Sequence, residues 1–350
     1  MKTETGCCGK RDPRVLIKQM DFFVFANRVE TEEKAIRFAF DLGLLDAIPP
    51  NCPRCSDPMK WERGIRRRGV NVMWRCSRSS HPKVSLSIFN RTGFQGFQVL
   101  VSAFLKTLFF IAQEQKLDEI VLNTKLSRPT VIKIHKKIRQ MIQWYSKSVK
   151  KRIGGVGMVV EIDECHLHSR KYGVGRVEAG ESWWVVGGIC RQTSEMFVEI
   201  VFDRSQDTLS KIIFENVQSE TTIITDCWPG YNKLQRMNLN YTHQKVNHSQ
   251  NFVCPEDRNI YTNTIERAWR SLREGIPMGV HLEEVESYIE RFLFFHHTHC
   301  KTSIEKFNAM VNVCWLFPRV NRVLFLVCGH NPIQFPFSYA FYPEQVMVYA

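Results

Sequence analysis

Three acidic residues are placed in the sequence so that they can bind metal ions together. Asp163 and Asp226 each end an apolar run that has the composition of a buried strand, and Glu266 lies in a segment whose spacing predicts a helix. Mg²⁺ prefers such hard oxygen ligands, and two ions about 3.5–4 Å apart can activate a hydroxyl and stabilise a leaving oxygen. Either aspartate alone is more ordinarily a turn residue. The three acids together predict a site for two Mg²⁺ (or Mn²⁺) ions.

Cysteine and histidine form a second candidate site near the N-terminus. Cys52 and Cys55 are a Cys-x-x-Cys pair, and Cys76 is followed five residues later by His81. Two pairs of such ligands separated by a short hairpin suit one tetrahedral Zn²⁺. A lone Cys-x-x-Cys can also be a redox motif or arise by chance. His81 is the weakest member, because a surface histidine would leave the fourth ligand to another residue. The pattern favours one structural zinc ion in a zinc ribbon.

Basic residues are concentrated in two segments. From Ile120 to Val160 the chain has no Asp or Glu, and a second basic group lies between Arg63 and Arg78. A charge run is often only a solvated helix face, but so long a run without acids is unfavourable unless a polyanion neutralises it. We therefore expect DNA contacts in both segments, from Arg66, Arg67, Arg68, Lys133, Lys136 and Lys137.

The composition restricts the class of protein. The 350 residues include 48 Lys and Arg against 35 Asp and Glu, a net charge of +13, which favours a polyanionic partner. The most apolar stretch, 97–112, is too short to span a bilayer and contains Lys106, so we expect no membrane partner. The N-terminus has no apolar signal core. Without such a signal, the 12 cysteines favour a reducing compartment and metal binding over disulfides.

The elements that carry the basic run predict a helix-turn-helix. Residues 117–122 favour a short helix, 123–126 a turn, and Ser127 and Pro129 suit the start of a second helix. Apolar residues then recur at helical spacing, while the lysines lie off that stripe. The basic second helix is the one that enters the DNA groove in this motif, although an ordinary helical hairpin has the same pattern.

The C-terminal half predicts an α/β domain. Three apparent strands, a helix, a fourth strand, and then more strand and helix follow one another from 158 to 275, the order of an RNase H-like domain with a mixed sheet flanked by helices. The predicted parts are a helical arm (1–46), a zinc ribbon (47–92), a helical, helix-turn-helix DNA-binding region (93–152), an RNase H-like catalytic domain (153–300) and a C-terminal extension without an assigned role (301–350).

Several motifs resemble the Merlin DNA transposases and their bacterial insertion-sequence relatives, a branch of the DDE transposases. The resemblance covers roughly residues 30–300 and includes the Cys-Pro-x-Cys ribbon. Its motifs are Val-Glu-Ile-Asp-Glu (160–164), Trp-Val-Val-Gly-Gly (184–188), Ile-Ile-Thr-Asp-Cys-Trp-Pro-Gly-Tyr (223–231), Val-Asn-His-Ser (246–249) and Tyr-Thr-Asn-Thr-Ile-Glu-Arg-Ala-Trp (261–269).

The resemblance implies a transposase that binds terminal inverted repeats, then cuts and joins double-stranded DNA with two Mg²⁺ ions. It implies at least a dimer on DNA, and a nuclear location if the source is eukaryotic or a cytoplasmic one otherwise. The family's acidic triad falls on Asp163, Asp226 and Glu266. Some bacterial relatives have Asn as the third member, which makes Asn263 an alternative, and His248 is a further auxiliary candidate. Two other hypotheses are a catalytically retired, transposase-derived DNA-binding protein and a structure-specific nuclease of the same fold.

Overall fold

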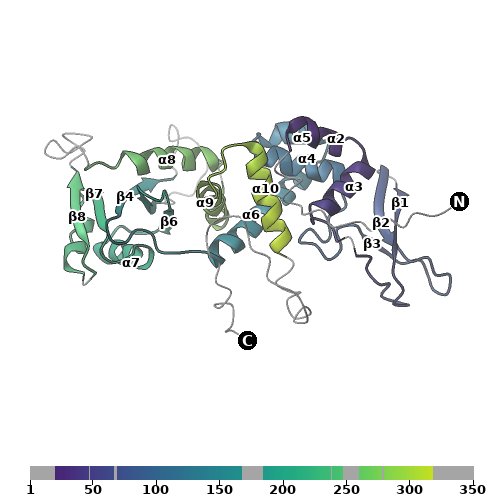
Figure 1. Ribbon diagram of the computed structural model, residues 1–350, viewed down its shortest axis with the longest axis horizontal. Coiled ribbons are helices and arrows are strands. Elements are labelled where there is room, and N and C mark those ends of the chain that lie inside the picture. The colour runs from purple at the N-terminus through teal and green to yellow at the C-terminus, as the bar shows by residue number, and fades with distance from the viewer. Residues whose placement is uncertain are drawn as a thin grey trace.

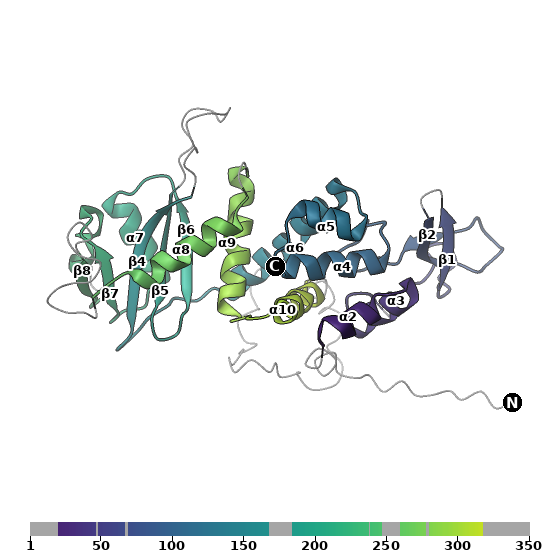
Figure 2. The same cartoon turned by 90° about the horizontal axis from the view of Figure 1, so that it is seen from above.

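The computed structural model describes residues 20–46, 48–66, 69–167, 184–237, 239–246, 260–277 and 280–317. The molecule is elongated, with a five-stranded sheet at one end, helices in the middle and a β-hairpin at the other end (Figures 1 and 2). No helix within these ranges is both long and apolar enough to cross a membrane.

Two short helices begin the described chain. Helix α2 (Phe22–Arg28) is capped by Asp21, and helix α3 (Glu32–Asp41) by Thr31, whose side chain accepts from the Lys34 amide at 3.3 Å. The Glu32 carboxylate also accepts from the backbone amides of Val101 and Ser102, at 2.6 and 3.0 Å, and so caps the next long helix from outside.

The small antiparallel sheet follows the arm. Strands β1 (Lys60–Arg66) and β2 (Gly69–Arg75) form a hairpin, and β3 (Ser85–Ser87) pairs with the other edge of β2. Buried Trp74 and Met59 attach the hairpin to the helical core.

The central helices are α4 (Val101–Ala112), α5 (Leu117–Thr124) and α6 (Arg128–Ser148). The predicted stripe on α6 is buried, and Lys125 supplies the turn with a φ of 56°. Ser127 occupies the N-cap position, but its hydroxyl bonds to Thr130 Oγ1 and caps no backbone amide. Helix α10 (Ser303–Leu316) packs against α4 and α6, so it belongs to this core although it comes last in the chain.

The large sheet has the mixed architecture that the sequence predicts. Its strands are β4 (Val159–His166), β5 (Trp184–Cys190), β6 (Met196–Val201), β7 (Thr222–Asp226) and β8 (Thr242–Val246), in the order β6-β5-β4-β7-β8. The β4–β5–β6 meander is antiparallel, whereas β4, β7 and β8 run parallel. Alternate side chains therefore face opposite layers of helices.

Helices cover both faces of this sheet. Helix α7 (Gln206–Asn216) packs on the face of Val160 and Ile162, and the 3₁₀ turns η2 (Pro229–Tyr231) and η3 (Leu234–Arg236) extend that layer. Helices α8 (Asn263–Gly275) and α9 (Leu282–His297) pack on the face of Cys165 and Val185. In Figure 2, α8 crosses the sheet obliquely and α9 stands between the sheet and the helical half.

A buried polar contact joins α6 to α9. The Arg139 guanidinium, only 3% exposed, binds Glu284 at 3.0 Å and the Ser287 hydroxyl at 3.1 Å, and lies 3.9 Å from the centre of the Tyr288 ring. Burial lowers the pKa of Arg139. Such a contact fixes the orientation of two helices because neither partner can be left uncompensated in a dry interface.

Candidate active site and metal centre

The two predicted aspartates lie at one edge of the large sheet. Parallel strands β4 and β7 pair through Glu161 and Ile224, and Asp163 and Asp226 each come two residues later. Side chains two residues apart on a strand share a face, so both aspartates point to the face that α8 covers. The carboxyl ends of parallel strands are the usual position for ligands in open α/β sheets.

Burial changes the acidity of Asp163. Burial, together with the negative charges of Asp226 and Glu266, raises the pKa of this carboxyl to about 6. The indole nitrogen of Trp269 opposes this shift by donating a 3.0 Å hydrogen bond to Asp163 Oδ2. The three predicted acids are therefore close enough to repel one another, and a cation at this edge would relieve the repulsion.

Helix α8 positions Glu266. Fully buried Glu161 accepts from the amides of Thr264 and Ile265 at 2.9 and 3.0 Å, and also binds the Arg191 guanidinium at 2.6 Å. The carboxylate thus caps the start of α8 and compensates its positive end. Glu266 lies in the first turn, on the exposed side of the helix.

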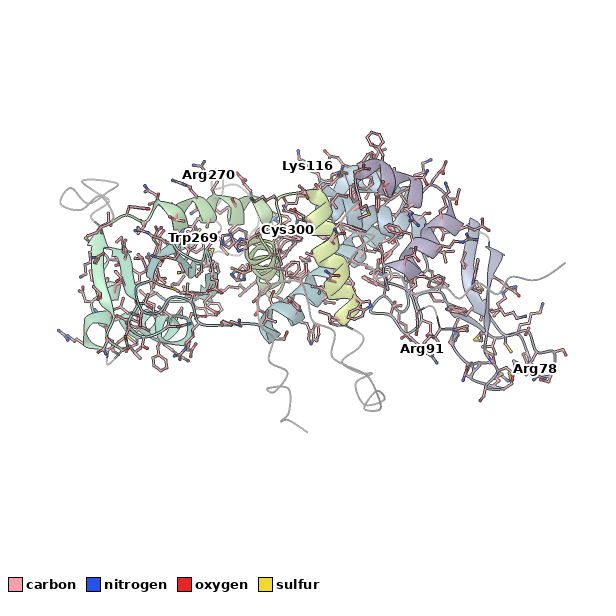
Figure 3. The ribbon with its side chains drawn as sticks, viewed as in Figure 1. Arg78, Arg91, Lys116, Trp269, Arg270 and Cys300 are labelled. Atoms are coloured by element: carbon pink, nitrogen blue, oxygen red, sulfur yellow. The ribbon has the colours of Figure 1, made fainter. Side chains whose placement is uncertain are left out.

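On the same helix, Trp269 faces the sheet and Arg270 faces away (Figure 3). Asn263, the alternative third ligand, is half-buried at the first residue of α8. The negative charge of Glu266 acts on Asp163 and raises its pKa. The choice of Glu266 over Asn263 as the third ligand stays a prediction. His248 lies outside the described residues.

Glu164 is a fourth acid at this edge, and it is not among the three acids that the sequence predicts. Its side chain points to the opposite face, as strand alternation predicts. The charge of Asp226 nevertheless acts on the Glu164 carboxyl. Burial, together with the charges of Asp226 and Asp163, raises the pKa of Glu164 to about 7. An acid next to a strand-end aspartate was the sequence signal that could have identified it.

Tyr231 closes the acidic site from the α7 side. Its side chain is fully buried, and burial together with the nearby acids holds its pKa well above the ordinary value. Within the described part of the chain, neither its hydroxyl oxygen nor Glu164 Oε1 has a hydrogen-bond partner, although the two groups are close enough to influence each other. Buried polar atoms without partners are costly, and the water shell of a bound ion can satisfy them. Carboxylate oxygens such as those of Asp163, Asp226 and Glu266 are the ligands that hard divalent cations prefer, and their role as metal ligands stays a prediction.

The N-terminal ligands also come together. The ligand atoms of Cys52, Cys55, Cys76 and His81 all lie within 4.8 Å of one another, and the shortest separations are 3.5–3.6 Å. Zn–S bonds of 2.3 Å in a tetrahedron would separate the sulfurs by about 3.7 Å. The Nδ1 of His81 bonds to the Pro82 carbonyl at 2.8 Å, which leaves Nε2 directed at the cysteines. This Cys₃His group fits one zinc ion, with His81 as the fourth ligand.

The predicted DNA-contacting residues have different surroundings. Lys133 is exposed on α6. Lys136 binds Glu284 of α9 at 2.6 Å, and the Lys137 ammonium lies 5.0 Å from the centre of the Phe317 ring. Part of the basic face of α6 therefore interacts with other residues of the same chain: Glu284 neutralises the charge of Lys136. Arg66 is the last residue of β1, and Arg67 and Arg68 lie outside the described residues.

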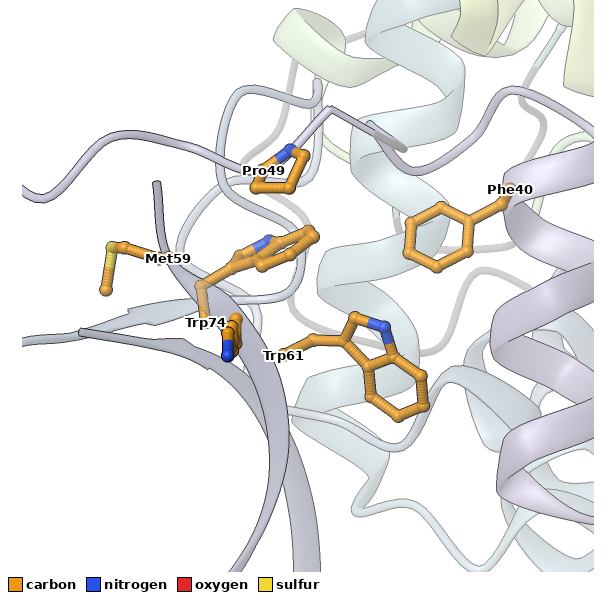
Figure 4. Close-up of a pocket in the computed structure, with 6 residues that line it drawn as sticks. Phe40, Pro49, Met59, Trp61 and Trp74 are labelled. Carbon is orange, nitrogen blue, oxygen red and sulfur yellow. The ribbon is translucent and has the colours of Figure 1, made fainter. Parts of the chain in front are cut away.

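An apolar cavity lies beside the hairpin of the zinc ribbon, and none of the proposed metal ligands lines it. Its volume is about 420 Å³, and Figure 4 shows it between α3 and the hairpin. It is lined by Phe40, Pro49, Met59, Lys60, Trp61 and Trp74. No acid lines it, so we assign it no part in metal chemistry.

Comparison with known proteins gives one family match. Residues 154–294 match the model of the ISXO2-like transposase domain, an insertion-sequence-type DDE transposase domain. The matched region contains the large sheet, α7, α8 and most of α9. This match supports a transposase-like function for the sheet domain. The comparison with curated proteins gives no match.

Among solved structures, one similar chain is from the cryo-EM structure of the simian T-cell lymphotropic virus intasome in complex with PP2A regulatory subunit B56 gamma. The identity is 10% and the TM-score is 0.27, with 53% of this chain and 66% of that chain covered. The chain thus spans slightly less than two thirds of that protein's length. A similarity this low supports no conclusion about fold or function.

Proposed function

We propose that this protein is a Merlin-type DNA transposase with an RNase H-like catalytic domain, which cuts transposon ends and joins them to target DNA. The observation that supports the proposal is the buried Asp163 carboxyl, whose pKa is raised to about 6 by burial and by the charges of Asp226 and Glu266. The match of residues 154–294 to an insertion-sequence transposase domain supports it independently.

The proposed chemistry is phosphodiester hydrolysis followed by transesterification, both by in-line attack at phosphorus. Two Mg²⁺ or Mn²⁺ ions, when bound, would activate the attacking hydroxyl and stabilise the leaving oxygen. Asp163, Asp226 and Glu266 hold the ions. Trp269 fixes the orientation of the Asp163 carboxylate, and Glu161 fixes the start of α8. These contacts hold the charged groups in place before the substrate arrives, which is how such sites accelerate the transfer.

The N-terminal half supplies DNA binding in this proposal. The zinc ribbon and the α5–α6 helix-turn-helix would bind the terminal inverted repeats, and exposed Lys133 would contact phosphate. We further propose that the chain has the five parts predicted from its sequence and that it acts on DNA as at least a dimer. For a eukaryotic source, we propose a nuclear location. Cutting two ends together requires two catalytic sites, which is the physical reason for the dimer.

A strand-transfer assay tests the proposal. Full-length protein is incubated with DNA carrying candidate transposon ends, a supercoiled target and Mg²⁺, and joined products are detected on a gel. Asp163→Ala should reduce cleavage on the order of a thousandfold, because losing one carboxylate weakens transition-state charge stabilisation by several kcal/mol. End binding should persist.

The second candidate is a retired transposase that only binds DNA. Such a protein would bind transposon ends in the presence of Mg²⁺ and leave them uncut. Asp163→Ala would then change neither DNA binding nor the amount of cleaved DNA. The four acids held at one edge disfavour it, because repulsion among unneutralised carboxylates is unfavourable unless a cation is bound there.

A further inference from the structure

Two tryptophans and an arginine form a stack beside the acidic site. Trp184 begins β5 and is paired with His166 at the end of β4, Arg204 follows β6, and Trp228 follows β7. All three therefore lie at the edge of the sheet that carries Asp163 and Asp226. The Arg204 guanidinium lies 3.8 Å from the centre of the Trp184 ring and 5.1 Å from that of the Trp228 ring.

Trp228 is held in place but not covered. Its backbone amide donates to Asp226 Oδ1 at 2.9 Å, so it is attached directly to a proposed metal ligand. A Cβ at Gly230 would come within 2.7 Å of the indole, which means that the ring rests on this glycine. The Gln206 amide bonds to the Pro229 carbonyl at 3.1 Å and secures the same turn. Even so, 42% of Trp228 remains exposed.

Arg204 has no acidic partner within hydrogen-bonding range among the described residues. The contrast is Arg191, which binds the carboxylate of Glu161. A guanidinium stacked on an indole uses its planar face and leaves the N–H groups at its edge to bind an anion such as phosphate. The positive charge of Arg204 lowers the pKa of Glu164. Arg204 therefore lies at the border of the acidic site.

We propose that Trp228 and Arg204 bind one unpaired nucleotide of a DNA strand next to the acidic site, with the base stacked on the Trp228 indole and its phosphate held by Arg204. The inference rests on the proposed function and names how one strand is held there. The base must be unpaired, because the faces of bases inside a duplex are already stacked on their neighbours. Aromatic stacking of this kind tolerates any base.

The test measures binding of the full chain to two fluorescein-labelled DNA probes, a blunt duplex and the same duplex with a short 3′ overhang that contains 2-aminopurine. An Asp163→Asn background keeps the DNA intact. Stacking on Trp228 should quench the 2-aminopurine. Trp228→Ala should abolish this quenching and weaken overhang binding roughly 5- to 150-fold, with blunt-duplex affinity nearly unchanged. Trp228→Phe should retain most of both signals.

Arg204→Ala should weaken overhang binding and lower its salt slope by about 0.7, the single-strand value for one phosphate, whereas Arg204→Lys should keep the slope. Phe214 is the matched control. It is an exposed aromatic residue under an arginine, Arg152, at the C-terminal end of α7 and away from the acids. Phe214→Ala should leave binding and quenching unchanged.

Two results separate this inference from the proposed function. In the first, the unsubstituted chain binds the blunt duplex, and Trp228→Ala binds the overhang probe with the same affinity and the same quenching as the unsubstituted chain. The proposed nucleotide site is then wrong, while the transposase proposal stands. If the unsubstituted chain binds neither probe, both are wrong. Equal melting temperatures of the variants show that the differences are not caused by unfolding.

Discussion

The indole nitrogen of Trp269 donates a 3.0 Å hydrogen bond to Asp163 Oδ2, and so ties helix α8 to strand β4 where the acids meet. Trp269 is 3% exposed, and its ring lies over Gly187, the residue opposite Asp163 on β5. Glu266 lies three residues before Trp269 on the same helix, so this contact sets the distance between the third acid and the first.

Removing this hydrogen bond should slow the reaction without unfolding the domain. Trp269→Phe keeps an aromatic ring but leaves Asp163 Oδ2 without its donor. Contacts that orient a metal ligand typically contribute 10- to 100-fold, and we expect a loss of that size in the cleavage rate measured at saturating Mg²⁺. End-DNA affinity should be unchanged.

Gly187→Ala provides an independent route to the same effect. A Cβ at this position would lie 2.4 Å from the Trp269 ring and 2.8 Å from the Phe197 carbonyl oxygen. The ring must shift, so cleavage should fall and the free energy of unfolding should decrease by about 1–3 kcal/mol. Normal cleavage in both variants would show that Trp269 does not orient Asp163.

The stability of the metal-free protein should decrease as the pH rises. Burial raises the pKa of Asp163 from 3.8 to about 6 and that of Glu164 from 4.5 to about 7. The folded state therefore holds protons that the unfolded state has already released. This contribution is complete below about pH 4 and is lost as the pH passes through 6–7.

Thermal melts from pH 5 to 8 with a chelator present check this pH dependence. Asp163→Asn should reduce the pH-dependent loss by a few kcal/mol at most, about 1.4 kcal/mol for each pKa unit. Mg²⁺ should raise the melting temperature of the unsubstituted protein more at pH 8 than at pH 5. A melting temperature that does not vary with pH would contradict the burial of these acids.

Glu161 should be structurally essential although it lies only two residues before Asp163. Glu161→Gln replaces a fully buried carboxylate that binds Arg191 and the start of α8. Breaking a buried ion pair costs about 3–5 kcal/mol, which chemical denaturation can measure. The control is Glu199→Gln, which breaks an exposed pair with Lys150 and should cost less than about 1 kcal/mol.

Zinc should be required for the hairpin and dispensable for the sheet domain. Full-length protein should contain one zinc ion, and Cys52→Ser should abolish it, because a structural zinc site contributes on the order of 10 kcal/mol to folding. DNA affinity should fall. Near-ultraviolet circular dichroism and metal analysis measure both effects, and Cys227→Ser, which lies outside the cluster, is the control. A zinc content well below one per chain would contradict the Cys₃His site.

The lysines of α6 should differ in their contribution to the salt dependence of DNA binding. Each phosphate contact adds about −0.9 to the slope of log affinity against log salt. Lys133→Ala should flatten the slope by about that amount. Lys136→Ala should change it less, because Glu284 already neutralises this ammonium at 2.6 Å. Lys211→Ala, at an exposed position on α7, is the control. Equal effects of Lys133 and Lys211 would place the DNA elsewhere.

The sequence alone determined features that depend on local spacing. The Cys-x-x-Cys pair and the later Cys76 and His81 predicted a group that the structure brings together, because ligand type and a hairpin between two pairs are short-range properties. Apolar runs predicted strands β4 and β7. Strand β7 ends at Asp226 as expected, whereas β4 continues past Asp163 to His166 because its pairing with β5 extends that far. The acid-free run predicted the basic helices. The roles of the three acids in catalysis stay predictions.

Only the tertiary structure decided how these elements meet. Lys136 is 148 residues from Glu284, and no local pattern shows that this lysine is neutralised. The charge of Asp226 acts on Glu164 although the two residues lie on different strands, and α10 returns from the end of the chain to complete the first core. Spacing within a segment fixes which face a side chain takes. The partner opposite that face depends on long-range packing, since burial and charge are shared between segments far apart in the sequence.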